Sequence, residues 1–450
     1  MGSRITTVFA CQSCGAVSPK WLGRCPECSE WNSFVEELRG ERGDAQTEAL
    51  AAPIAEVALV VAPRLETMLP GLDRVLGGGL VPGSVVLLGG EPGIGKSTLL
   101  LQAARAVAGQ SREALYVTGE ESSGQVRLRG ERLGVRQEWL WVLAETDVSR
   151  IAAESRIRAP AILIVDSIQA VREPTLSSAA GTVSQVRESA SVLMRHAKTG
   201  GVPVVLIGHV TKDGSLAGPK SLEHLVDTVI TMEGDRGSSR RILRASKNRF
   251  GPVDELALYE MTGEGLNEVP NPSAALLSER RKGMAGSAVT AAREGSRCLL
   301  VEVQALIGPA TAGTPRRVAI GLDAGRLALL LAVLEGAGLP LSSREVFVSC
   351  TGGLEVHEPA GDLAVVAALA SCSRGRALPE DAVFFGEIGL LGEIRRVPAA
   401  ASRIKEAAAL GFRTAYMPSG NAGEAAAYPD LQIRPTGSVT EFLKGLFPSR

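Results

Sequence analysis

Residues 89–98, GGEPGIGKST, carry the residue types that bind a polyphosphate. They follow the apolar stretch SVVLLGG and precede STLLLQAARAVA, whose apolar residues repeat at helical spacing. Glycines let backbone N–H groups close around phosphate oxygens, and a helix N-terminus adds positive potential. The spacing fits the P-loop pattern G-x4-G-K-[ST], so we expect Lys96 to reach the β- and γ-phosphates of ATP, Ser97 to bind Mg2+ and Thr98 to lie near the α-phosphate. The predicted nucleotide loop comprises Gly90, Glu91, Pro92, Gly93, Ile94, Gly95, Lys96, Ser97 and Thr98.

Polar residues also end three other apolar stretches. PAILIVDSIQAV reaches Asp166, which we expect to hold Mg2+ through water. EALYVTGEES places two carboxylates after a strand: Glu120 comes first and is our predicted base for the attacking water, and Glu121 is the alternative base or a solvated neighbour. VPVVLIGHV ends at His209, which would sense the γ-phosphate or be a plain strand-end histidine. Because parallel strands end at one edge of a sheet, these groups predict a hydrolytic site.

Four cysteines near the N-terminus form two C-x2-C pairs separated by ten residues. Each pair can turn two thiolates inward, and four thiolates complete a tetrahedral Zn2+ shell, so residues 1–35 are predicted to be a zinc finger. Gly15 follows the first pair, where such a turn often needs a positive φ. Two disulfides or a redox pair are the alternatives. The predicted ligands are Cys11, Cys14, Cys25 and Cys28.

Composition limits the class of protein. The chain has 450 residues, 45% of them apolar, and a net charge of −1, so it is expected to hold several domains, and any nucleic-acid site must be a local patch. No apolar run suggests a membrane span, the N-terminus lacks the core of a secretory signal, and seven cysteines fit a reducing cytoplasm. The charged, alanine-rich residues 36–63 are predicted to be a linker.

The order of these strand ends resembles the RecA-type core of hexameric helicases, over residues 64–270. SKNRFG, residues 246–251, resembles the KNRFG signature of the RadA (Sms) family of bacterial DNA repair proteins, and the four-cysteine module and EPAGDLAVVAALAS fit the same family. By residue type alone, Lys247 and Arg249 are cations on a solvated turn. The resemblance implies that they act on a neighbouring subunit's nucleotide. It also implies a hexameric, DNA-dependent ATPase of helicase type that partners with RecA and acts on single-stranded and branched DNA in branch migration and break repair.

Two stretches rich in small polar residues, 172–188 and 211–224, are expected to leave the catalytic strands as loops. They offer cations for phosphates and lack aromatic residues, so we expect contacts that follow the DNA backbone. Ordinary flexible loops are the alternative. The candidate DNA-binding residues are Arg172, Arg187, Lys212 and Lys220.

Residues 271–450 alternate strand and helix patterns and predict an α/β or α+β domain. They resemble the proteolytic domain of Lon. Where Lon has its Ser–Lys dyad, this chain has Asp362 and Ala401, and Lys405 lies a helical turn later. A dyad needs both groups, so the domain is expected to be a proteolytically inactive scaffold for a ring. The overall expectation is α/β: a RecA-like P-loop ATPase core with an N-terminal zinc ribbon and a C-terminal Lon-protease-like domain. A nucleotide-switched scaffold and an ATP-dependent protease are the alternative functions.

Overall fold

The computed structural model describes residues 5–11, 14–40, 63–209, 222–234, 239–253, 255–295, 297–310, 314–356 and 358–448. The chain divides into two compact units, Met1–Glu268 and Val269–Arg450. The sequence analysis placed this boundary between residues 270 and 271. Within the described ranges, no helix is both long and apolar enough to cross a membrane.

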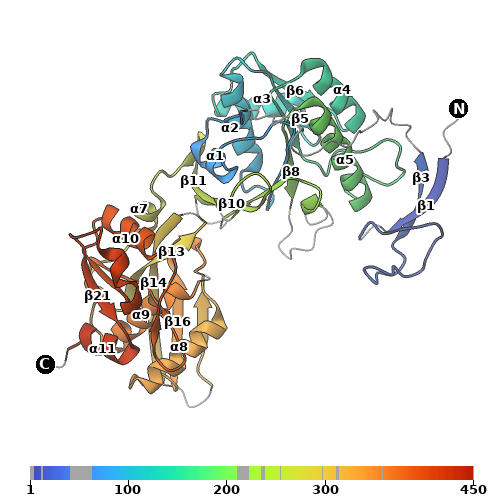
Figure 1. The fold of residues 1–450 in the computed structure, drawn as a ribbon. Coiled ribbons are helices and arrows are strands. Elements are labelled where there is room, and N and C mark those ends of the chain that lie inside the picture. The colour runs from blue at the N-terminus through green and yellow to red at the C-terminus, as the bar shows by residue number, and fades with distance from the viewer. Residues whose placement is uncertain are drawn as a thin grey trace, which may run out of the picture. The chain divides into compact units, whose positions relative to one another are not determined.

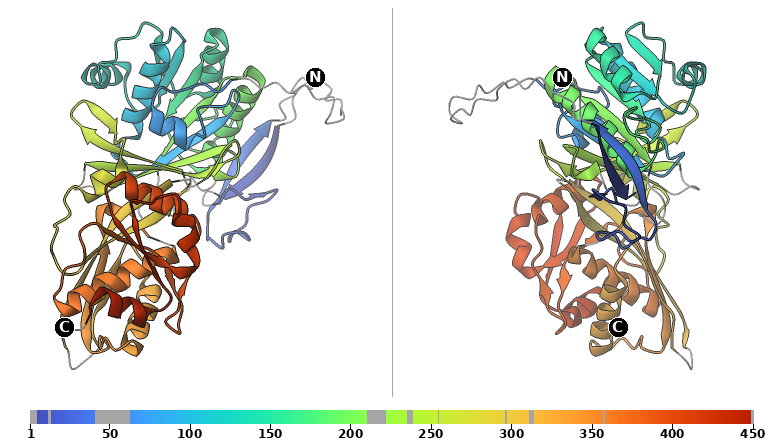
Figure 2. Two further views of the ribbon diagram at one scale, coloured as in Figure 1. Left: turned by 60° about the vertical axis from the view of Figure 1, so that its left-hand side comes forward. Right: turned by 90° about the vertical axis from the view of Figure 1, so that its right-hand side faces the viewer.

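The N-terminal module is a small antiparallel sheet of order β2-β1-β3, in which β1 and β3 form a long pair (Figure 2). The predicted linker was wrong at its start. Residues 36–40 belong to β3 because they pair residue by residue with β1, from Phe9 opposite Glu36 to Ile5 opposite Gly40. The strands are β1 (Ile5–Cys11), β2 (Val17–Ser18) and β3 (Phe34–Gly40).

The central domain is built on a sheet that, among the described residues, has nine strands in the order β12-β11-β10-β9-β4-β8-β7-β5-β6. The six strands from β9 to β6 are parallel, and β10 to β12 add an antiparallel edge. This confirms the RecA-like core. The strands are β4 (Val85–Gly90), β5 (Ala114–Thr118), β6 (Leu140–Ala144), β7 (Ile162–Asp166), β8 (Val204–His209), β9 (Thr228–Glu233), β10 (Arg240–Asn248), β11 (Leu256–Thr262) and β12 (Gly265–Glu268).

Helices cover both faces of this sheet (Figure 1). Alternate residues of β4 enter different cores: Val86 and Leu88 pack with α1, α2 and α3, whereas Val85 and Leu87 pack with α4 and α5. A strand buried on both faces explains the continuous apolar run before the glycine loop. The helices are α1 (Pro70–Val75), α2 (Lys96–Ala108), α3 (Ser123–Arg132), α4 (Val148–Arg158) and α5 (Val183–Gly200).

The C-terminal unit holds a mixed sheet of order β15-β16-β14-β13-β17-β20-β21, with α9 and α10 packed against β13 and β14. The stretch VFFGEIGLLGEIRRV contains the antiparallel pair β18–β19. The strands are β13 (Ser287–Glu294), β14 (Arg297–Ala310), β15 (Arg317–Ile320), β16 (Arg344–Cys350), β17 (Ala382–Phe384), β18 (Glu387–Ile388), β19 (Ile394–Arg395), β20 (Thr414–Pro418) and β21 (Gln432–Thr436). The helices are α7 (Pro272–Leu277), α8 (Ala324–Gly336), α9 (Asp362–Arg374), α10 (Ala400–Ala409) and α11 (Val439–Leu446), with 3-10 turns at Thr351–Gly353, Pro359–Gly361 and Ser419–Ala425.

Candidate nucleotide-binding site and zinc centre

The glycine loop joins the carboxyl end of β4 to the first residue of α2, as its sequence predicts. Gly90 and Gly95 have φ angles of 155° and 120°. A Cβ on Gly90 would lie 2.6 Å from the carbonyl oxygen of Met232, so only glycine fits this close approach. The buried Lys96 Nζ donates to the carbonyl oxygens of Gly90 (2.7 Å) and Glu91 (2.8 Å). The ammonium is therefore already placed inside the loop that would hold phosphates.

Burial lowers the pKa of Lys96 to about 8, although the charges of Asp166, Glu120 and Glu91 oppose that shift. A bound polyphosphate would add negative charge beside the amine and favour its protonated form. The loop therefore presents a cation whose charge depends on an anionic partner.

The two neighbouring carboxylates lie in the short bend between β5 and α3. Thr118 ties the bend down, because its Oγ1 donates to the carbonyl oxygen of Glu121 (2.9 Å) and accepts from the Glu121 N–H (3.0 Å). Ser122 and Gln125 then start α3 with a reciprocal capping box. A fixed bend holds the side chains of Glu120 and Glu121 in defined directions.

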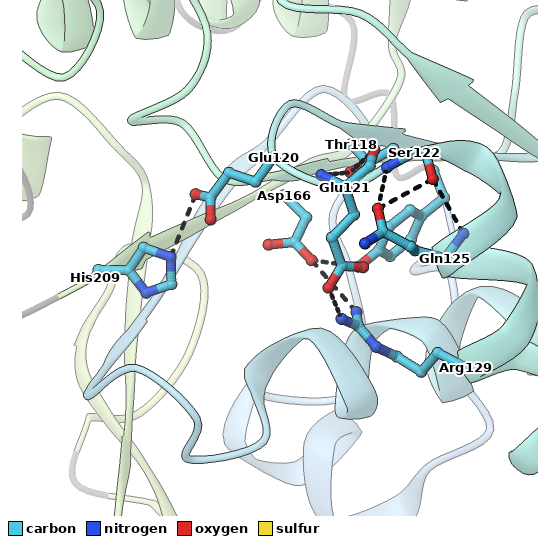
Figure 3. A network of polar contacts seen from close by, with 9 residues as sticks. Thr118, Glu120, Glu121, Ser122, Gln125, Arg129, Asp166 and His209 are labelled. Carbon is cyan, nitrogen blue, oxygen red and sulfur yellow. Dashed lines mark hydrogen bonds and ion pairs between the residues drawn. The ribbon is translucent and has the colours of Figure 1, made fainter.

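Those directions differ (Figure 3). Glu120 faces the end of β8, where its Oε1 lies 3.5 Å from His209 Nε2, and it also accepts a hydrogen bond from Ser167 Oγ. Glu121 turns to the other side and accepts a hydrogen bond from Arg129 on α3. It is thus an ion-pair partner, whereas the sequence had left it as the alternative base or a solvated neighbour.

Asp166 ends β7 in the same region, with Oδ2 accepting from Tyr116 Oη at 2.5 Å. Ser97 is the second residue of α2, so a hydroxyl and a carboxylate, oxygen ligands that suit Mg2+, come from a helix start and a strand end. The structure thus brings Lys96, Asp166 and Glu120 together, since both carboxylates affect the pKa of Lys96.

Sequence reasoning missed three residues of this region: Tyr116, Arg129 and Arg241. Arg241 on β10 is buried, and its Nε donates to the carbonyl oxygen of Ile94 in the glycine loop (3.0 Å). It lies 147 residues further along the chain, so no local pattern reveals the contact. The only signal for Arg129 was its helix, which starts immediately after the two glutamates.

Lys247 and Arg249 lie far from this chain's own glycine loop. Asn248 pairs with Thr228, which pairs with Val86 at the start of β4, whereas Gly90 at its end pairs with Met232. Arg249 is anchored one step further back, at Asp227, by its backbone N–H (3.1 Å) and by an ion pair (3.2 Å). The turn and the glycine loop therefore lie at opposite ends of the parallel strands.

Lys247 and Arg249 differ in what holds them. Lys247 Nζ donates to the carbonyl oxygens of Glu223 (2.5 Å) and Val226 (2.8 Å), whereas the Arg249 side chain is 51% exposed. Burial is the main reason that the pKa of Lys247 is lowered. Lys247 thus stabilises the segment from Glu223 to Val226, which precedes β9, and the Arg249 side chain remains exposed to solvent.

The predicted DNA-binding residues are only partly described. Arg172 and Arg187 are both exposed, but Arg187 is not in a loop: α5 begins at Val183, so the predicted loop ends six residues earlier than expected. Residues 182–188 read TVSQVRE, whose apolar spacing continues the helix that follows. Lys212 and Lys220 lie outside the described residues.

The four cysteines of the ribbon have ligand atoms within 4.8 Å of one another. Cys11 Sγ lies 3.6 Å from Cys28 Sγ, and Cys14 Sγ lies 3.5 Å from Cys25 Sγ. A tetrahedron with Zn–S bonds of about 2.3 Å has S···S edges of about 3.8 Å, so this donor set fits Zn2+. Gly15 has a φ of 76°, which confirms the expected turn.

The positions that correspond to the Lon dyad hold an ion-paired carboxylate, Asp362, and an alanine, Ala401. Asp362 is buried, faces the guanidinium of Arg326 on α8, and accepts from the Ile388 N–H (3.0 Å). Ser371 is also buried, with its hydroxyl bound to Gly286 N–H and the Arg376 carbonyl. Lys405 is exposed on α10. Neither half of a Ser–Lys dyad is found at these positions.

Comparisons with known proteins agree with this architecture. A family model described as an AAA domain matches residues 51–215, and one described as a rubredoxin metal binding domain matches residues 9–36. The chain is 47% identical over 446 residues to a protein of Bacillus subtilis (strain 168) named DNA repair protein RadA, covering 97% of each chain. This chain belongs to the RadA family. RadA of Pseudomonas aeruginosa is 48% identical, covering 98% of each chain, and RadA of Escherichia coli (strain K12) is 47% identical, covering 92%. The family resemblance inferred from KNRFG is thereby confirmed.

Proposed function

We propose that this chain is a DNA-dependent, Mg2+-dependent ATPase that acts as a helicase-like motor on recombination intermediates. It would promote branch migration in homologous recombination and DNA break repair, together with RecA, in the cytoplasm. The observation that carries the proposal is the placement of Lys96 inside the glycine loop, with Asp166 and Glu120 close enough to act on its charge. Its relatives are named DNA repair protein RadA, which supports the assignment to repair.

In the proposed reaction, water attacks the γ-phosphate of ATP in line with the leaving oxygen. Glu120 orients that water, and His209 beside it senses whether the γ-phosphate is present. Lys96 neutralises charge on the β- and γ-phosphates, and Thr98 lies near the α-phosphate. When bound, Mg2+ would be held by Ser97 and, through water, by Asp166, and would neutralise the charge that develops on the phosphate oxygens.

The ring is proposed from the position of Arg249 relative to the glycine loop of its own chain. Arg249 is exposed at the end of the sheet opposite its own glycine loop, so it suits a neighbouring protomer's nucleotide. We propose a hexamer in which each nucleotide lies between two protomers, with the C-terminal unit as an inactive scaffold. Hydrolysis would then change how adjacent protomers pack.

Single-stranded and branched DNA would be held mainly through phosphates. Arg172 follows β7 and Arg187 lies on α5, and both are exposed cations. Lys212 and Lys220 are proposed to join them. Such contacts follow the backbone and read little sequence. The zinc ribbon is proposed to bind Zn2+ through its four cysteines.

The test is the ATPase rate with and without single-stranded DNA, together with strand displacement by wild type and by Lys96→Ala. We expect stimulation by DNA and displacement in the wild type, with both lost in the variant. ATPase activity that DNA does not stimulate would instead favour the nucleotide-switched scaffold. Casein degradation would favour the protease, which the buried Arg326–Asp362 pair argues against.

A further inference from the structure

A tyrosine hydroxyl and a guanidinium approach the same oxygen of Asp166 (Figure 3). Tyr116 lies on β5 next to β7, is fully buried, and donates its hydroxyl proton to Asp166 Oδ2 at 2.5 Å. The hydroxyl is therefore a donor to one oxygen of this carboxylate.

Arg129 reaches the same place from α3. Its Nη2 is bound by Glu121, while its Nη1 is buried, lies 3.9 Å from Asp166 Oδ2 and has no hydrogen-bond acceptor among the described residues. Glu121 thus fixes a guanidinium whose second nitrogen points at Asp166. The capping box of Ser122 and Gln125 keeps this first part of α3 in register with the bend that carries Glu121.

Both contacts fall on Oδ2. In the described part of the chain, no hydrogen bond is made to Asp166 Oδ1. A carboxylate held by one oxygen keeps its plane and leaves the other oxygen free for a metal-bound water. Because Lys96 senses the charge of Asp166, that free oxygen belongs to the same electrostatic site as the glycine loop.

We infer that Tyr116 and Arg129 are positioning residues that orient Asp166 toward the metal, with Glu121 acting through Arg129. This inference rests on the proposed Mg2+-dependent ATPase function. The two adjacent glutamates then have separate roles. Glu120 orients the attacking water, and Glu121 holds the Arg129 guanidinium that orients Asp166 toward the metal.

The test is Tyr116→Phe, which removes one oxygen and preserves the ring in the core. A fluorescent ATP analogue is bound at increasing Mg2+ concentration, and we expect the half-saturating Mg2+ concentration to rise about 10-fold. Binding of the analogue in EDTA should not change, because Lys96 and the loop are intact. Tyr259→Phe is the matched control, since Tyr259 is an equally buried tyrosine on β11, in the antiparallel edge of the sheet.

Arg129→Gln and Glu121→Gln should raise the same Mg2+ requirement, whereas Arg127→Gln, an exposed residue of the same helix, should not. Melting temperatures separate positioning from packing. If Tyr116→Phe keeps the wild-type Mg2+ requirement, whether or not its melting temperature falls, the inference is overturned. If wild type itself shows no Mg2+-dependent binding, the proposed function falls first.

Discussion

The sharpest prediction concerns Arg249 and the neighbour it would serve. From Val85, beside Asp227, to Gly90 is five residues along β4, or about 16 Å at ~3.3 Å per residue. The Arg249 side chain starts at the far end of that span, so it cannot complete its own chain's nucleotide site. Half of the Arg249 side chain is exposed, whereas Asp227 is buried and also accepts a hydrogen bond from the Val85 N–H (3.0 Å), so this carboxylate keeps a partner when the ion pair is lost. Arg249→Ala should therefore fold normally.

We expect Arg249→Ala to lower the ATPase rate by about 10³-fold or more, the range for a cation supplied to a phosphoryl-transfer site. Lys247→Ala should behave differently. Its ammonium serves the carbonyl oxygens of Glu223 and Val226, so its loss should cost about 1–3 kcal/mol of unfolding free energy. Urea denaturation distinguishes the two variants before any activity is measured.

A mixing assay then tests the action in trans. Lys96→Ala and Arg249→Ala protomers are each inactive alone, but co-assembled in equal amounts they should form intact sites at about a quarter of head-to-tail interfaces. The control replaces the Arg249→Ala partner with a Lys96→Ala, Arg249→Ala double variant, which has no intact glycine loop and must stay inactive. Recovery no greater than in this control would refute the reasoning, as would wild-type activity of Arg249→Ala alone.

Three further outcomes are expected. Burial lowers the pKa of Lys96 to about 8, so the unfolded chain binds more protons than the folded one between about pH 8 and 10.5. The free energy of unfolding should therefore rise with pH in this range. Urea titrations of Lys96→Met should show no such rise. Removing the metal with a chelator, or Cys25→Ser, should unfold the ribbon and change its tryptophan fluorescence, with the melting of the central domain unchanged. Arg326→Ala should destabilise the C-terminal unit by about 3 kcal/mol in denaturant titrations, because it leaves the buried Asp362 unpaired, and replacing both residues by apolar ones should restore most of that loss.

The parts of the site that could be predicted from sequence are those whose residues are neighbours in the chain. A strand, a glycine loop and a helix N-terminus follow one another within about twenty residues, so their spacing alone predicts the cradle of Lys96. The strand-end rule similarly predicted Asp166 and His209 in one region. Both predictions rest on the period of buried strands, which apolar runs reveal directly.

The parts that could not be predicted depend on packing between distant segments. Arg241 meets Ile94 only because β10 folds back beside β9, and residues 36–40 became a strand only because β1 lies alongside them. Residues 36–40 are mostly charged, and their partner strand β1 lies about thirty positions earlier in the chain. Their own sequence therefore resembles a linker and not a strand. The assignment of Arg187 to a loop was a boundary error, because the small polar residues that precede α5 suit loops, whereas the helix already begins at Val183.

The sequence predicted Glu120 as the base only because it comes first after the strand, with Glu121 as the alternative. The two side chains have the same chemistry and adjacent positions, and only their surroundings separate them. Glu121 accepts from a guanidinium, which occupies an oxygen that a water would need. Glu120 meets a hydroxyl and an imidazole, groups that can each release it without leaving a buried charge unpaired. The carboxylate that is free to turn toward a γ-phosphate is therefore Glu120, and α3, which supplies Arg129, is the element that makes the difference.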